Sequence, residues 1–205
     1  MTTSGRRDVF ETSARQRLQV FFLTGQSDPP RCALSPSQQA FIDALPLPES
    51  AKLRLNFPYA ADTAPWRATS LLIASVNNVM LYLRSQRPGF AHHAPALLRQ
   101  LERADQTLIL AGSSGLELLA NLRLPPESLR SVHVFAYGPV ARGRPPCACT
   151  LVQGRGDWIS RAWFRSVDHR VDCSHMDYLE SPEVLALCVA KVRELVESRA
   201  VGVAS

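Results

Sequence analysis

The sequence predicts an α/β domain in which helices cover both faces of a doubly wound, mostly parallel sheet. Short apolar runs alternate with longer segments whose apolar residues recur at helical spacing, the pattern of a parallel sheet with helical crossovers. The chain has 205 residues, of which 46% are hydrophobic, a size that suits one core better than two. We therefore expect a single domain over residues 17–205, preceded by a flexible polar leader over residues 1–16.

Five apolar runs are the expected strands, and each ends at a glycine, a proline or a loop. They are LQVFFLTG (18–25), AKLRLNFPY (51–59), QTLILAG (106–112), SVHVFAYG (131–138) and CACTLVQG (147–154). In open parallel sheets the ligand crevice lies beyond the carboxyl ends of the strands. The residues that follow each run are therefore the first candidates for a functional site.

Helical patterns separate and follow these runs. The expected helices lie in SPSQQAFIDAL (35–45), TSLLIASVNNVMLYLRSQ (69–86), APALLRQLERA (94–104), SGLELLANL (114–122) and SPEVLALCVAKVRELVES (181–198). Ser-Pro pairs open the first and the last of them and supply N-cap and first-turn residues. The apolar segment 69–83 predicts either a core helix or one wall of an acyl-chain groove, and two asparagines make it too short for a bilayer span.

Charge and cysteine content restrict the class of protein. The net charge is +5, but the arginines are scattered singly, so we expect no nucleic-acid partner. Five cysteines, an odd number, without an apolar secretory segment favour a cytoplasmic protein. Arginine, alanine and proline are abundant whereas lysine occurs only twice, a bias typical of a GC-rich bacterial genome.

One strand end carries a serine in a tight turn. The run 106–112 breaks into Ala-Gly-Ser-Ser-Gly and continues as a helix, so Ser113 lies between strand and helix. A nucleophilic serine at such a turn requires small residues two positions before and two positions after it. Ala111 and Gly115 satisfy this for Ser113, whereas Ser114 would have Leu116 at the second position. By itself this pentapeptide is also compatible with a helix cap or a phosphate-binding turn.

The arrangement resembles the nucleophile elbow of the α/β-hydrolase superfamily, although alanine replaces the more usual first glycine. In that superfamily the triad follows the chain order serine, acid, histidine. Asp157 in VQGRGDWIS and His175 in VDCSHMDYLESPEV, just ahead of the last helix, resemble its acid and histidine segments. The resemblance implies a small, lid-poor serine hydrolase, without the first strands and a large cap of the family, whose catalytic residues are Ser113, Asp157 and His175.

Other residues could take these roles. His169, beside Asp168, is a rival base, although it lies farther from the last helix. Asp172 and Asp177 are rival acids, but both are close in sequence to His175, whereas acid and base usually arrive on separate loops.

The resemblance also implies an oxyanion hole made by two backbone amides. One is the amide of Ser114, directly after the nucleophile. The other belongs to the loop after the first strand, where Thr24 and Gly25 stand in place of the family's His-Gly, so that Gln26 is the expected donor. This loop is equally compatible with a simple turn.

Four residues are expected to contact substrate because they follow strands or adjoin the histidine. They are Gly25, Ser27, Tyr59 and Met176. We expect no metal or other cofactor, since Cys147-x-Cys149, with Cys173 and His175, matches no common zinc spacing.

These observations predict a serine hydrolase that cleaves acyl thioesters linked to coenzyme A or an acyl carrier protein through an acyl-serine intermediate. Small, lid-poor hydrolases resemble stand-alone thioesterases, and a positive net charge suits an acidic carrier. A carboxylesterase for small soluble esters is the alternative. A catalytically silent binding or scaffold protein on the same fold is the alternative from another class.

Overall fold

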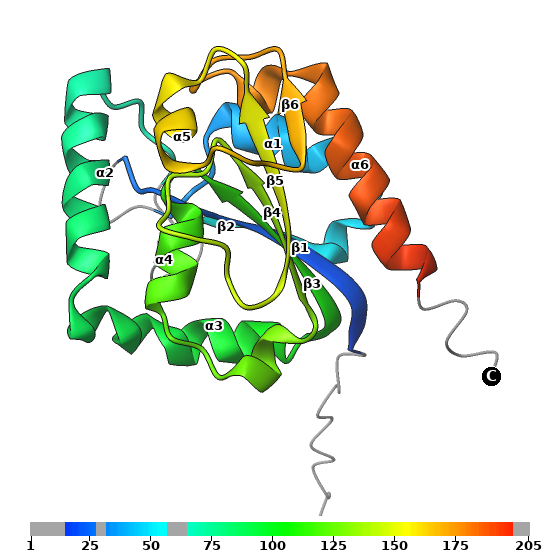
Figure 1. Cartoon of the computed structure of the whole chain (residues 1–205). Coiled ribbons are helices and arrows are strands. Elements are labelled where there is room, and N and C mark those ends of the chain that lie inside the picture. The colour runs from blue at the N-terminus through cyan, green and yellow to red at the C-terminus, as the bar shows by residue number, and fades with distance from the viewer. Residues whose placement is uncertain (1–14, 28–31, 57–64, 199–205) are drawn as a thin grey trace, which may run out of the picture.

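Residues 15–27, 32–56 and 65–198 are described by the computed structural model. Their strands are β1 (Gln16–Thr24), β2 (Lys52–Asn56), β3 (Ala104–Gly112), β4 (Val132–Tyr137), β5 (Ala148–Gly154) and β6 (His169–Val171). They form a six-stranded sheet in the order β2-β1-β3-β4-β5-β6, and every neighbouring pair is parallel (Figure 1). The expected α/β class with a doubly wound parallel sheet is confirmed.

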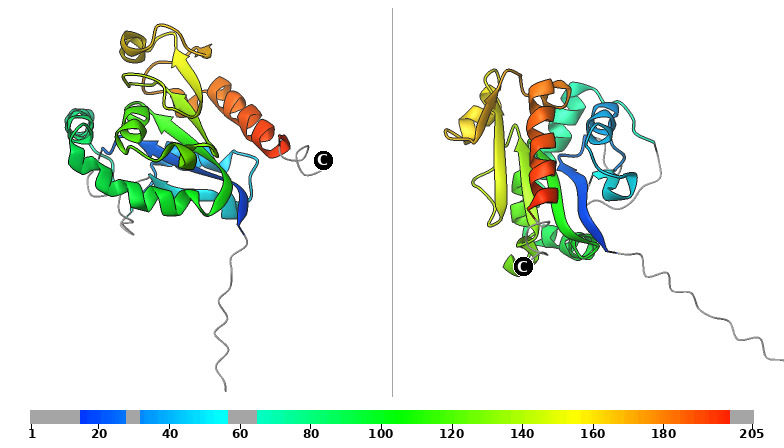
Figure 2. Two further views of the ribbon diagram at one scale, coloured as in Figure 1. Left: turned by 60° about the horizontal axis from the view of Figure 1, so that its bottom comes forward. Right: turned by 90° about the vertical axis from the view of Figure 1, so that its right-hand side faces the viewer.

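Helices cover both faces of this sheet. They are α1 (Pro36–Asp43), α2 (Leu71–Ser85), α3 (Ala94–Leu101), α4 (Gly115–Asn121), α5 (Trp158–Trp163) and α6 (Pro182–Glu197). The helices α3 and α4 pack on one face, and α1 and α6 pack on the other (Figure 2). Residues 1–14 of the expected leader lie outside the described residues, and Gln16 already belongs to β1.

The alternation of side chains along β1 explains why two cores form. Phe21 and Leu23 belong to the apolar core under α3 and α4, whereas Val20 and Phe22 belong to the core under α1 and α6. Because successive side chains of a strand point to opposite faces, a strand buried on both sides reads as one continuous apolar run. This is why β1 was recognisable in the sequence.

The five apolar runs correspond to β1–β5, with ends shifted by a few residues, whereas β6 and α5 were not expected. β6 has three residues, of which only Val171 is buried, so it carries no apolar run. The Ser-Pro signals hold, because Ser35 and Ser181 cap the N-termini of α1 and α6 with their side chains.

Helix α2 contradicts the expectation of a core helix. It lies at the edge of the molecule, with α4 between it and the sheet (Figure 1), and most of its large apolar side chains, among them Leu72 and Val76, are exposed, whereas Leu81 packs against the core. Within the described ranges, no helix is long and apolar enough to cross a bilayer.

Gly115, the small residue required after the expected nucleophile, is where α4 touches β1. A Cβ atom at this position would lie 1.9 Å from the carbonyl oxygen of Leu23, which is backbone and has little freedom to move.

We expect Gly115→Ala to lower the free energy of unfolding by about 1–3 kcal/mol, measured by denaturant titration. Gly143→Ala is the matched control, because nothing lies within 4 Å of its Cβ position. Equal stability of the two variants would contradict the close approach.

Candidate active site

The serine of the tight turn has a backbone conformation that is rare for residues other than glycine. Ser113 follows β3 with a φ of 51°, in the left-handed region. Two backbone hydrogen bonds to the end of β4 and the loop after it hold it there: its amide donates to the carbonyl of Tyr137 (3.1 Å), and its carbonyl accepts from the amide of Val140 (2.9 Å). Such strain persists only where the surroundings enforce it, and it concentrates at functional sites.

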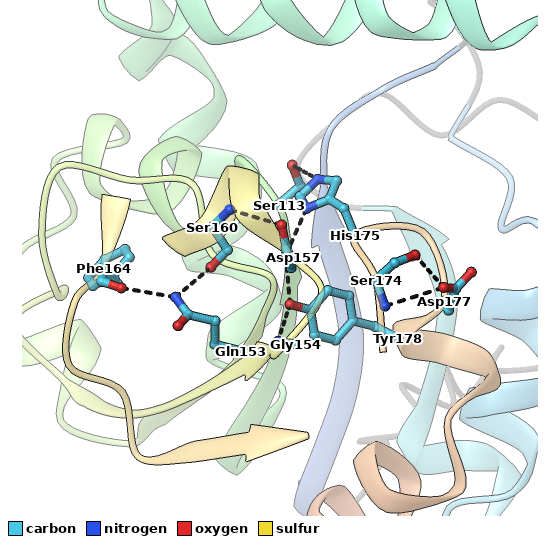
Figure 3. A network of polar contacts seen from close by, with 10 residues as sticks. All are labelled: Ser113, Gln153, Gly154, Asp157, Ser160, Phe164, Ser174, His175, Asp177 and Tyr178. Carbon is cyan, nitrogen blue, oxygen red and sulfur yellow. Dashed lines mark hydrogen bonds and ion pairs between the residues drawn. The ribbon is translucent and has the colours of Figure 1, made fainter. Parts of the chain in front are cut away.

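Asp157 follows β5 and is fully buried, with a relative exposure of 0%. Its Oδ1 accepts from the amide of Ser160 (2.9 Å), which caps the N-terminus of α5. Its Oδ2 accepts from the hydroxyl of Tyr178 (2.7 Å) and lies 2.9 Å from Nδ1 of His175 (Figure 3). The carboxylate is therefore fixed from three sides, and one oxygen is directed at the imidazole.

His175 bridges this carboxylate and the serine. Its Nε2 lies 3.3 Å from Oγ of Ser113, and its Nδ1 faces Asp157 (Figure 3). The loop that carries it follows β6 and is closed by Asp177, which accepts hydrogen bonds from the amide and the hydroxyl of Ser174. The side chain of His175 is 20% exposed, so the imidazole reaches solvent, whereas Asp157 does not.

The electrostatics favour an ionised acid beneath the imidazole. Burial alone would raise the pKa of Asp157, but the hydrogen bonds from His175, from the Ser160 amide and from Tyr178 outweigh it and hold this pKa below its ordinary value of 3.8. A carboxylate that stays ionised fixes the proton of His175 on Nδ1 and leaves Nε2 free to accept a proton from the serine.

Tyr178 is a positioning residue that the sequence did not reveal. Its hydroxyl donates to Asp157 and accepts from the amide of Gly154 (2.6 Å), so it ties the acid to the end of β5. Gly138 makes room for both side chains: its φ is +55°, and a Cβ there would lie 2.6 Å from the Tyr178 ring. A lone tyrosine in a loop carries no spacing signal that would have identified it.

We expect Tyr178→Phe to lower kcat roughly tenfold with little change in KM, because it removes a hydrogen bond that orients and acidifies Asp157. The variant also leaves the Gly154 amide without this acceptor, so the free energy of unfolding should fall by about 1–3 kcal/mol. Steady-state kinetics on any accepted ester substrate and denaturant titration measure both effects.

The control is Tyr82→Phe on α2, which removes a hydroxyl away from the acid. It should leave kcat within about twofold. A Tyr178→Phe enzyme with unaltered kcat at every pH would show that the tyrosine is only structural.

The structure does not bring the rival residues to the serine. His169 begins β6, and Asp168 beside it accepts from the Leu151 amide (2.7 Å) and pairs with Arg144. Asp172 is exposed and pairs with Arg155, 2.9 Å away. Asp177, the other rival acid, closes the histidine loop as described above.

The loop after β1 lies against the residue that follows the nucleophile. Thr24, at the end of β1, is paired in register with Gly112, and a Cβ at Gly25 would lie 3.3 Å from Oγ of Ser114. Gln26 is 9% exposed and follows directly. The two segments from which the oxyanion donors were expected are therefore neighbours.

Two buried polar atoms line this junction. Within the described residues, Oγ of Ser114 and Oδ1 of Asn78 have no hydrogen-bond partner, and both approach Gly25. A buried polar atom without a hydrogen bond raises the free energy of the fold. A polar group of a ligand bound beside Ser113 could supply the missing hydrogen bonds.

The expected substrate contacts have different outcomes. Gly25 lies at the junction just described, and Ser27 accepts a hydrogen bond through its carbonyl from Asn77 of α2 (2.8 Å). Met176, directly after the histidine, is 70% exposed, whereas Tyr59 lies outside the described residues.

The described residues contain no group of three or more His, Cys, Asp or Glu side chains that could hold a metal ion. Cys147 and Cys149 pack partly against the core, and burial raises their pKa values to about 11 and about 12. Both thiols therefore stay protonated at neutral pH and are poor ligands and nucleophiles.

Comparison with solved structures finds a carboxylesterase from Mesorhizobium loti, with 13% sequence identity and a TM-score of 0.42 over 88% of this chain and 89% of that chain. The chain matches no family model, and a comparison with curated proteins also gives no match. Any assignment of function therefore depends on the geometry of the site.

Proposed function

We propose that the protein is a serine hydrolase that cleaves acyl esters or thioesters through an acyl-serine intermediate. The observation that carries this proposal is the continuous contact from Oγ of Ser113 through His175 to the buried Asp157. A serine hydroxyl is a weak nucleophile unaided, and a neighbouring base oriented by an acid is the arrangement that activates it.

In the proposed reaction, Oγ of Ser113 attacks the acyl carbonyl while Nε2 of His175 takes up the hydroxyl proton. The same proton then goes to the leaving alcohol or thiol, and the acyl group stays on the serine oxygen. Water, deprotonated by His175, attacks the acyl-serine, and the acid product leaves as the serine regains its proton. Asp157 stabilises the imidazolium in both halves of the cycle.

Backbone amides are proposed to stabilise the negative oxygen that forms on the carbonyl. The Ser114 amide is at the N-terminus of α4, and the Gln26 amide belongs to the adjoining loop. Removal of one such donor typically lowers kcat by roughly 10²–10³-fold.

Within this class we propose thioesters as the substrate, with a carrier-protein or coenzyme A thiol as leaving group. Solvent reaches the reacting side chains, since Ser113 is partly exposed and His175 is 20% exposed, which supports a leaving group that extends out of the site. The net charge of +5 suits an acidic carrier. Paired acyl-thioester and oxygen-ester substrates with the same acyl chain test this preference, and equal or better kcat/KM on the oxygen ester would overturn it.

Fluorophosphonate labelling tests the reaction class. The activated oxygen of Ser113 should displace fluoride and form a stable bond to phosphorus, which peptide mass spectrometry detects on the peptide containing Ser113. Ser113→Ala should remain unlabelled, whereas Ser50→Ala, an exposed serine away from the site, should label like the wild type. A wild-type protein that does not label would favour the catalytically silent binding protein.

A further inference from the structure

Helix α2 turns its asparagines toward the protein and most of its large apolar side chains toward solvent, whereas an ordinary surface helix buries its apolar side. Asn77 donates to the carbonyl of Ser27, Asn78 approaches Gly25, and Ser85 accepts from Asn121 of α4. The inner side is thus anchored by amides and a hydroxyl, together with Leu81, which packs against the core under α3 and α4. The outer side is free to contact something else.

The outer side is a continuous apolar face. Its side chains are Leu72 (82% exposed), Ile73 (56%), Val76 (60%), Val79 (58%), Met80 (44%) and Leu83 (51%). They recur at helical spacing, so they form one stripe along a helix about 22 Å long. We call this stripe the α2 face. An apolar patch of this kind on a protein surface usually marks an interaction site.

The charged side chains of α2 and of the segments directly before and after it in the sequence have one sign. No aspartate or glutamate occurs between residues 65 and 101, and Arg67, Arg84 and Arg87 near the two ends of the helix are exposed. Two tryptophans adjoin it, each 43% exposed: Trp66 precedes the helix, and Trp163 contacts Tyr82 with ring centroids 5.9 Å apart. Apolar residues flanked by arginine and tryptophan are the composition of helices that lie in a membrane interface.

The charges argue for a membrane interface, rather than a second copy of the chain, as the surface that the α2 face contacts. A two-fold pair of α2 faces would bring arginines from both copies together, with no carboxylate between residues 65 and 101 to neutralise them. An acidic folded partner would neutralise the arginines, but interfaces between folded proteins normally include hydrogen bonds. Between Leu72 and Leu83, Ser75 is the exposed polar residue, so the α2 face offers one side chain for such a hydrogen bond.

We infer that the α2 face binds a lipid surface that carries anionic headgroups. The apolar stripe enters the boundary of the acyl chains, and the arginines at its ends pair with the headgroups. Because Asn77 and Asn78 of the same helix contact the loop next to Ser114, binding places the proposed site close to the lipid surface. The inference rests on α2 with the arginines and tryptophans beside it, and it does not require the proposed hydrolase activity.

Vesicle flotation with the full chain tests the inference. The probes are vesicles of phosphatidylcholine with and without phosphatidylglycerol, and the measured quantity is the partition coefficient. Wild-type protein should bind the phosphatidylglycerol vesicles more tightly, and added salt should weaken this binding. Val76→Gln with Met80→Gln should lower the partition coefficient at least tenfold, because two exposed apolar side chains no longer enter the lipid.

Two further variants separate the contributions. Arg84→Gln should lower partitioning about fivefold, and only on the phosphatidylglycerol vesicles. Val196→Gln is the matched control, because this valine is 48% exposed on α6, and it should partition like the wild type. Circular dichroism establishes that each variant is folded.

Several outcomes would overturn the inference. Wild-type protein that stays with the buffer at low salt, or a double variant that binds as tightly as the wild type, excludes the lipid surface. A dimer in light scattering that Val76→Gln with Met80→Gln converts to a monomer would assign the α2 face to a second copy instead. An acyl carrier protein that binds the wild type but not the double variant, with no vesicle binding, would assign it to that partner.

Discussion

Ser113→Ala is expected to lower kcat by about 10⁵–10⁶-fold on any substrate that the wild-type protein hydrolyses. The substitution removes the oxygen that forms the acyl intermediate and leaves the imidazole and the acid in place. Residual turnover of about 10³–10⁴ over the uncatalysed reaction would come from substrate binding and the oxyanion donors. Steady-state kinetics measure the loss, and prior titration with a fluorophosphonate excludes traces of wild-type enzyme.

The variant should remain folded, because the Ser113 side chain is only partly buried and the two backbone hydrogen bonds that hold the turn do not depend on its hydroxyl. A folded Ser113→Ala protein that retains more than about a hundredth of the wild-type kcat would exclude the acyl-serine mechanism.

Asp157→Asn is expected to lower kcat by about 10⁴-fold at neutral pH. The amide that replaces the carboxylate favours the wrong tautomer of His175, with the proton on Nε2, so that the ring can no longer accept the serine proton. The buried hydrogen bond from the Ser160 amide to Oδ1, which asparagine can still accept, should keep the side chain in place. Asp172→Asn, which removes an exposed carboxylate paired with Arg155, is the control and should change kcat by a few-fold at most.

The kinetics distinguish Asp157 from a purely structural residue. A structural defect lowers the fraction of protein that a fluorophosphonate can titrate, whereas loss of the correct tautomer lowers the rate per titrated site. An Asp157→Asn protein with full rate per site would show that another group orients His175.

The carboxylate of Asp157 also makes the free energy of unfolding depend on pH in the acid range. Its folded pKa lies below the ordinary value of 3.8, so its ionised form stabilises the fold above that value, and this contribution is lost as the pH falls through the folded pKa. We expect the wild type to lose more unfolding free energy than Asp157→Asn when denaturant titrations are compared at neutral pH and near pH 3. Parallel acid dependence of the two proteins would contradict the lowered pKa.

Much of the fold could be read from the sequence because the central strands are buried on both faces. Such strands must be apolar throughout, and β1 and β3–β5 were found from that property. The turn at Ser113 was recognisable for a related reason. The close approach of Gly115 to β1 leaves no room for a side chain, so this position must be glycine, and a glycine can be recognised in the sequence.

Other features left no mark that pattern reasoning could use. β6 has two exposed residues out of three and is defined by its pairing with β5, which depends on residues elsewhere in the chain. The pattern of α2 gave its helical period correctly, but period alone does not state which side faces the protein. Tyr178 acts through a hydroxyl whose partners, Gly154 and Asp157, are more than twenty residues away along the chain.

The complete burial of Asp157 beneath a ring that solvent can reach has a consequence for chemical probes. A carbodiimide used with an amine, which together amidate accessible carboxyl groups, should modify exposed acids such as Asp172 and spare Asp157. Of the three triad side chains, small-molecule inhibitors likewise meet only the serine oxygen and the outer edge of the imidazole. Compounds designed to pair with the carboxylate itself would have no route to it.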